Sequence, residues 1–162
     1  MEAPQAPVCD PALSRAWFDR DLAPLVNSPE TYLLAGLRLL KAVYPIVEVG
    51  LRWGLTNGEI ILHVDATDYH YFPPSGWWID SGGTPLLPGR GVIPIDAGFQ
   101  VGPTPSGIQR SWLCFQGWRE FHEHPGHQEP SWRWVRSMPG GRFPGLLTQL
   151  ASDLSDPRVR RV

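Results

Sequence analysis

The segment IVEVGLRWGLTNGEIILHVD, residues 46–65, decides the fold class of this chain. Apolar and polar residues alternate on both sides of Asn57-Gly58, and a period of two is typical of a strand with two different faces. Asn-Gly is the dipeptide most typical of a two-residue hairpin turn. The segment therefore predicts an antiparallel hairpin. Its same-face residues are Val47, Val49, Leu51 and Trp53 in the first strand and Ile60, Leu62 and Val64 in the second.

A helix is predicted before the hairpin, over residues 29–43. Ser28-Pro29 is an N-cap signal with proline at the first helical position, and Tyr44-Pro45 ends the helix because a residue before proline avoids the α region. The apolar residues at helical spacing are Leu33, Leu34, Leu37, Leu40 and Val43. A similar signal at Asp10-Pro11 predicts a short helix over 12–18. That helix lies in an N-terminal extension, residues 1–27, whose first nine residues are expected to be disordered.

Shorter elements are predicted after the hairpin. Pro73-Pro74 cannot occupy a central strand, so an edge crossing with a strand at 77–80 is expected. Residues 81–107 are rich in glycine and proline and predict an irregular region with a short strand at 91–94. A strand at 108–115 and a helix from Phe143 to Leu154 follow. Helices and antiparallel strands in separate runs indicate an α+β domain over 28–155, followed by a basic tail, 156–162.

Composition excludes several classes of partner. The formal net charge is -2, and the only basic run is RVRR near the C-terminus, so no nucleic-acid partner is expected. The chain has no apolar run long enough to cross a bilayer, and MEAPQAPVCD has neither the basic nor the apolar part of a signal peptide. Two cysteines do not make a disulfide framework. We therefore expect a cytoplasmic protein with reduced thiols and no membrane partner.

The segment SWLCFQGWREFHEHPGHQEPSWRW, residues 111–134, gathers Cys114, His122, His124 and His127. Three interpretations are open. The three imidazoles, with or without the thiol, could bind zinc, which takes tetrahedral nitrogen and sulfur ligands. Cys114 could be a nucleophile whose thiolate is stabilised by Arg110, Arg119 and the histidines. Cys114 could also be a small hydrophobic residue of a core strand.

A zinc site and an acyl acceptor compete for the same sulfur. A cysteine that completes a closed tetrahedral site cannot form a thioester. If Cys114 is a nucleophile, the expected catalytic residues are Cys114, His122, His124 and His127, without a metal or other cofactor. A metal site formed by the three histidines is the alternative. Cys9 has no comparable neighbours in the sequence.

The order of elements and the run GWREFHEHPGH, residues 117–127, resemble divergent bacterial relatives of ubiquitin-conjugating enzymes found in defence operons. The resemblance spans roughly 28–155. It implies an N-terminal helix packed on an antiparallel meander, an irregular active-site region and one C-terminal helix. It also implies that Cys114 accepts a ubiquitin-like modifier from an activating enzyme and passes it to a target amine. Helix 29–43, with Arg38 and Lys41 outward, would contact the activating enzyme.

The chain departs from the family before the cysteine. The His-Pro-Asn triplet of the eukaryotic enzymes is absent from TPSGIQRSWLC, which precedes and includes Cys114. The histidine run is our candidate substitute for that triplet. Two other functions stay open. One is a non-catalytic scaffold of the same fold that binds the modifier or the activating enzyme, and the other is a zinc-binding domain that uses His122, His124 and His127.

Overall fold

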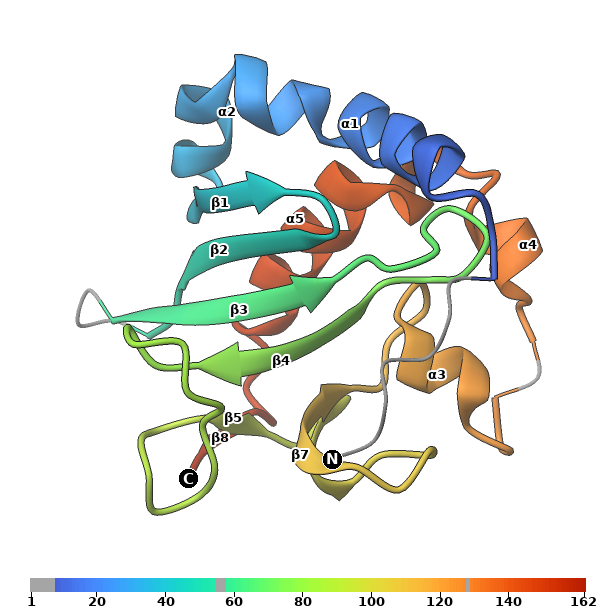
Figure 1. Ribbon diagram of the computed structural model, residues 1–162. Coiled ribbons are helices and arrows are strands. Elements are labelled where there is room, and N and C mark those ends of the chain that lie inside the picture. The colour runs from blue at the N-terminus through green and yellow to red at the C-terminus, as the bar shows by residue number, and fades with distance from the viewer. Residues whose placement is uncertain (1–7, 55–57, 128) are drawn as a thin grey trace.

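The computed structural model describes residues 8–54, 58–127 and 129–162. It is an α+β structure with an N-terminal helix, a four-stranded antiparallel sheet and a C-terminal helix (Figure 1). In chain order the elements are α1 (Pro11–Asn27), α2 (Pro29–Leu34), β1 (Leu37–Val43), β2 (Ile46–Arg52), β3 (Glu59–Asp65), β4 (Ser75–Ile79), β5 (Pro94–Ile95), β6 (Phe99–Pro103), β7 (Gln109–Leu113), α3 (Arg119–Glu123), α4 (Trp132–Val135), the 3-10 helix η1 (Pro139–Gly141), α5 (Phe143–Asp153) and β8 (Arg160–Arg161).

The helix near the N-terminus is longer than the short helix predicted over 12–18. Asp10 caps α1 by accepting a hydrogen bond from the backbone N–H of Ala12 at 2.9 Å, as an N-cap aspartate commonly does. Phe18, Leu22 and Leu25 follow one face of the helix and are buried in the core. The hydrophobic core therefore continues into the segment that we expected to be an extension. The first seven residues of that segment lie outside the described part of the chain.

The helix predicted over 29–43 is wrong beyond its first turns. Helix α2 ends at Leu34, and Gly36 then adopts a left-handed conformation with φ of 80°, which glycine tolerates best. The following residues form β1 and pair antiparallel with β2. Leu34 is 86% exposed, so the apolar residues that suggested one helical face do not share a buried face. Pairing with β2 overrides the helical spacing of the leucines.

The hairpin predicted at 46–65 is confirmed, although Asn57 of its turn lies outside the described residues. Strands β2 and β3 pair antiparallel, with Val49 opposite Leu62. The two strands are the centre of a sheet with the order β1-β2-β3-β4, in which β1 and β4 are the outer strands. Strand β4 begins two residues before the strand predicted at 77–80. Figure 1 shows α5 behind this sheet and α1 near its β1 side.

Two small strand pairs order part of the region that was expected to be irregular. Strand β6 pairs with β7, which confirms the strand predicted at 108–115, and β5 pairs with β8. The basic tail predicted at 156–162 is therefore partly built into the structure. The guanidinium of Arg161 lies 4.2 Å from the centroid of the Trp53 ring and donates to the Trp53 carbonyl at 3.0 Å.

Helix α5 confirms the helix predicted from Phe143. Phe143, Leu146, Leu147 and Leu150 are buried on the face that meets the core. In the described residues, no helix has the length and apolar character that a membrane span requires.

Candidate active site

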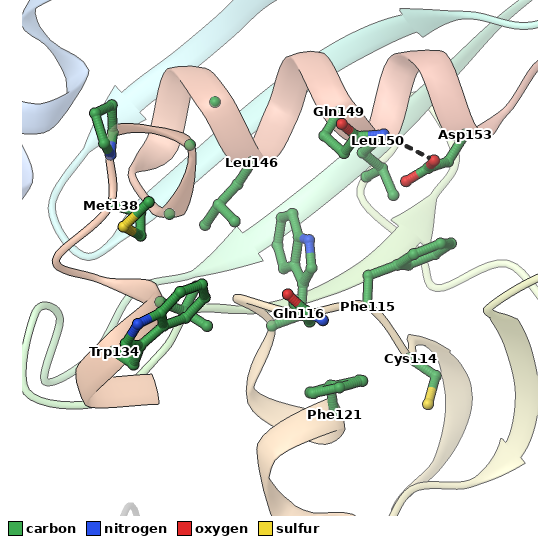
Figure 2. A pocket seen from close by; sticks show the side chains of 16 residues that line it. Cys114, Phe115, Gln116, Phe121, Trp134, Met138, Leu146, Gln149, Leu150 and Asp153 are labelled. Atoms are coloured by element: carbon green, nitrogen blue, oxygen red, sulfur yellow. Dashed lines mark hydrogen bonds between the residues drawn. The ribbon is translucent and has the colours of Figure 1, made fainter. Parts of the chain in front are cut away.

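Cys114 lies directly after β7, where the strand leaves the small sheet and turns toward α3. Its backbone N–H donates to the Gly98 carbonyl at 2.8 Å, which anchors the residue. The side chain is partly buried and lines a cavity of about 660 Å³ between this segment and α5. Figure 2 shows Cys114 at the edge of the cavity, with its sulfur directed away from Leu146 on α5.

The thiol is not activated by neighbouring positive charge. Burial raises the pKa of the Cys114 thiol and is the cause of the shift. The two arginines expected beside it are engaged elsewhere. Arg110 forms an ion pair with Glu120 at 2.7 Å, and Arg119 donates to the carbonyls of Pro73 and Thr67. At neutral pH the group is therefore mainly a thiol, because burial disfavours the thiolate.

The three histidines line a different cavity, of about 460 Å³, together with Tyr71 and Trp132. Helix α3 separates the two spaces, because Phe121 lines the first cavity and His122 the second. The structure thus brings the histidines near one another, but it does not gather them around the Cys114 sulfur as we expected. The spacing of the motif could not indicate this, since it does not show which side of α3 each ring occupies.

His122 nevertheless contacts the segment that carries the cysteine. Its Nε2 accepts a hydrogen bond from the backbone N–H of Gly117 at 3.0 Å. Burial lowers the pKa of His122 to about 4, so the ring is neutral near pH 7 and Nε2 is free to accept. This contact allows His122 to fix the path of the chain between Cys114 and α3.

His124 and His127 belong to the turn after α3. Nδ1 of His124 accepts from the Gly126 N–H at 3.0 Å. The His127 ring stacks on Phe121, with 4.4 Å between ring centroids. The His124 and His127 rings are neighbours, 4.9 Å apart by the same measure. These contacts order the turn and leave both rings outside the cavity that Cys114 lines.

The histidines do not form a metal-binding arrangement in the described part of the chain. No group of three or more His, Cys, Asp or Glu side chains there is placed to hold a metal ion. Nε2 of His122 and Nδ1 of His124 already accept backbone hydrogen bonds. A neutral imidazole offers one lone pair to a ligand or a donor, so these two atoms are not free to bind zinc.

Asp153 and Gln149 are site residues that sequence reasoning missed. Both lie on α5 and line the cavity of Cys114, and Gln149 donates to Asp153 at 3.0 Å (Figure 2). Burial raises the pKa of Asp153 above its ordinary value. Their spacing of four residues on a predicted helix was the available signal, but nothing in the sequence relates them to Cys114.

Apart from Gln116, the remaining walls of this cavity are apolar or lack side chains. Trp134 and Met138 stand at its rim and are 55% and 45% exposed. Gly140, Gly141 and Gly145 leave backbone on the surface of the cavity. The cavity thus combines apolar side chains with exposed backbone.

No family model matches the chain, and no curated protein matches it either.

The chemistry of the site therefore has to be argued from its geometry. A partly buried thiol lies at one edge of an apolar cavity whose lining includes one carboxyl group of raised pKa. A thiol can exchange with a thioester, and a carboxylate of raised pKa can accept a proton from an amine. Both steps are possible without a metal or an organic cofactor.

Proposed function

We propose that this chain accepts a ubiquitin-like modifier as a thioester on Cys114 and transfers it to a target amine, as part of a bacterial defence system. The observation that carries the proposal is the position of Cys114 at the edge of an apolar cavity large enough for an extended peptide segment. The other thiol, Cys9, is held by Asp68, whose carboxylate accepts from the Cys9 sulfur at 3.4 Å. Cys114 is thus the better candidate acceptor.

The order of elements supports the finer assignment to a ubiquitin-conjugating-enzyme-like fold. An N-terminal helix precedes four antiparallel strands, and an irregular region then leads to the cysteine and the C-terminal helix. In this arrangement the N-terminal helix is α1 rather than residues 29–43. We therefore move the proposed contact with the activating enzyme to the exposed face of α1, which includes Leu13, Arg15 and Asp19.

The reaction consists of two acyl transfers. The Cys114 thiolate attacks the thioester carbonyl carbon, a new C–S bond forms, and the bond to the activating enzyme's sulfur breaks. That sulfur leaves as a thiolate and takes up the proton that Cys114 lost. The target amine then attacks the same carbonyl carbon, and the C–S bond to Cys114 breaks. Asp153 can accept the amine proton, which finally reaches the released Cys114 thiolate.

The raised pKa of Cys114 fits a carrier of acyl groups. A thiolate of higher pKa is a stronger nucleophile per ion, although fewer ions are present. It is also a poorer leaving group, so the thioester resists attack by water and by unpositioned amines. The apolar rim of Trp134 and Met138 and the glycine backbone beside it would then hold the last residues of the modifier.

A non-catalytic scaffold is the second candidate. The observation that favours it is that the Cys114 sulfur points away from α5 and that burial, without an opposing positive charge, raises its pKa. A scaffold of this fold would bind the modifier through the same apolar cavity without forming a covalent bond.

One experiment separates the two functions. The protein is mixed with a ubiquitin-like protein whose C-terminus carries a thioester of mercaptoethanesulfonate, and adducts are measured by intact mass with and without a reducing agent. We expect a thiol-sensitive adduct in the parent and in Cys9→Ala, none in Cys114→Ala, and a thiol-resistant oxyester in Cys114→Ser. Binding without an adduct in the parent would support the scaffold, and an adduct that requires Cys9 would contradict the proposal.

A further inference from the structure

A cluster of three polar side chains joins the elements around Cys114. Ser75 and Glu120 are each 2% exposed, and the Arg110 side chain is 17% exposed. Nη2 of Arg110 donates to the Ser75 hydroxyl at 2.8 Å and to Oε1 of Glu120 at 2.7 Å. The Ser75 hydroxyl donates to the same Glu120 oxygen. Ser75 belongs to β4, Arg110 to β7 and Glu120 to α3.

The cluster joins the two ends of the segment that carries Cys114. Arg110 precedes Cys114 on β7, and Glu120 follows it on α3, so their ion pair holds both ends of the intervening chain. Ser75 ties this closure to β4, an outer strand of the main sheet. The Trp77 ring covers the Arg110 guanidinium, with 4.1 Å from its carbon to the ring centroid. These contacts hold the chain on both sides of Cys114, in addition to the hydrogen bond from the Cys114 N–H to Gly98.

The cluster is poorly suited to stabilise the fold. Glu120 Oε2 and Arg110 Nε are buried, and within the described residues neither has a hydrogen-bond partner. A buried ion pair must offset the desolvation of both charges, and unsatisfied atoms reduce the gain further. Hydrophobic replacements of such pairs are often tolerated without loss of stability. The cluster instead fixes the relative positions of β4, β7 and α3, since directed hydrogen bonds allow fewer arrangements than apolar contacts.

We propose that Arg110, Glu120 and Ser75 are positioning residues that hold Cys114 in its partly buried place at the edge of the cavity. The claim that this place serves acyl transfer rests on the proposed function. The claim that the cluster sets the environment of the thiol does not, and it can be measured by chemical modification alone.

The test uses a Cys9→Ser background, in which Cys114 is the only thiol. Arg110→Met combined with Glu120→Leu removes both charges and roughly keeps the volumes. Alkylation of Cys114 by iodoacetamide is followed by mass spectrometry across alkaline pH, with circular dichroism and thermal melting to check the fold. We expect a folded variant in which alkylation near neutral pH is at least about threefold faster and the apparent pKa of the thiol falls by about half a unit. Burial is what raises that pKa, and a released segment loses burial.

Controls make each outcome decisive. Arg38→Met with Glu59→Gln removes an exposed ion pair on β1 and β3 and should leave alkylation unchanged. Asp153, the charged group across the cavity, is intact in every variant. If the double variant does not fold, Ser75→Ala decides, with a smaller change in the same direction expected. Parent-like alkylation rates and apparent pKa in a folded variant would overturn the proposal. Failure of the proposed function would appear separately, as a parent protein that forms no thioester.

Discussion

Gly117 donates its backbone N–H to Nε2 of His122 at 3.0 Å, and this hydrogen bond joins the cysteine-bearing segment to the neighbouring cavity of histidines. Nε2 can accept only while the imidazole is neutral. Burial lowers the pKa of His122 to about 4, so the acceptor is present throughout the neutral range. The hydrogen bond is lost only in acid, and this has a measurable consequence.

Stability is expected to fall as the pH is lowered from about 6.5 toward 4. The pKa of His122 is lowered from its ordinary value of 6.5 to about 4 by burial. Between these values the unfolded chain binds the proton and the folded chain does not, so lower pH favours unfolding. The full shift would amount to roughly 3 kcal/mol, which partial exposure of the ring reduces to about 1–2 kcal/mol. Urea unfolding at a series of pH values measures this free energy.

His122→Gln is the matched variant for that measurement. Its side-chain oxygen can still accept from Gly117, but it does not titrate. The loss of stability in acid should therefore be smaller than in the parent. Part of it should remain, because burial also lowers the pKa of His70. An unchanged pH dependence in His122→Gln would contradict the assignment of the effect to this ring.

Alkylation of Cys114 should continue to accelerate at high pH. In a Cys9→Ser background, the rate with iodoacetamide follows the thiolate fraction. Burial raises the pKa of the thiol above its ordinary value of 9.0, so the rate should still be rising where a small free thiol has reached its plateau. Stopped reactions analysed by mass spectrometry give the profile, with glutathione as the reference. A plateau below that of glutathione would show an activated thiolate instead.

Asp153→Asn should slow transfer from Cys114 to a small amine by about a hundredfold, the lower end of the range for loss of a proton acceptor. The carboxyl group lines the cavity that Cys114 also lines, and burial raises its pKa above the ordinary value. Formation of the thioester should be unaffected, since that step needs no amine. Discharge of the preformed thioester measures the rate. Glu30→Gln, at an exposed position on α2, is the control and should transfer normally.

Arg15→Glu should slow loading of Cys114 by the activating enzyme without lowering the melting temperature. Arg15 lies on the exposed face of α1, and its ion pair with Asp19 has a separation of 3.7 Å and is largely exposed. Such pairs add little to stability. Lys41→Glu tests the contact surface that residues 29–43 would have formed as a helix, and it should load at the parent rate. Slow loading in Lys41→Glu with normal loading in Arg15→Glu would instead place the contact with the activating enzyme on β1.

Elements whose apolar residues follow one clear period could be predicted from the sequence. Elements whose apolar residues fit both a helix and a strand could not. The strict alternation around residues 46–65 suits only strands, and the helix from Phe143 has an amphipathic face with a proline at its start. Residues 37–43 fit a helix by the spacing of their leucines and a strand by their apolar content. Only the pairing with β2 decides between the two. The pairing of β5 with β8 joins distant parts of the chain and leaves no local signal.

The candidate site was predictable to a similar extent. The strand that ends beside Cys114 could be expected from its apolar residues. The separation of the histidines from the thiol could not be predicted. It depends on how the short helix α3 is oriented in the tertiary structure. Asp153 reaches the cavity only through the packing of α5 on the core.

The order of the main sheet also bears on self-modification. Lys41 is the only lysine of the chain, and it lies on β1, the outer strand opposite β4. Strand β7, which leads to Cys114, contacts β4, so the width of the sheet separates the lysine from the thiol. An acyl group carried on Cys114 would meet no lysine side chain of its own molecule at close range. Any modified Lys41 found by mass spectrometry would therefore point to transfer between two molecules.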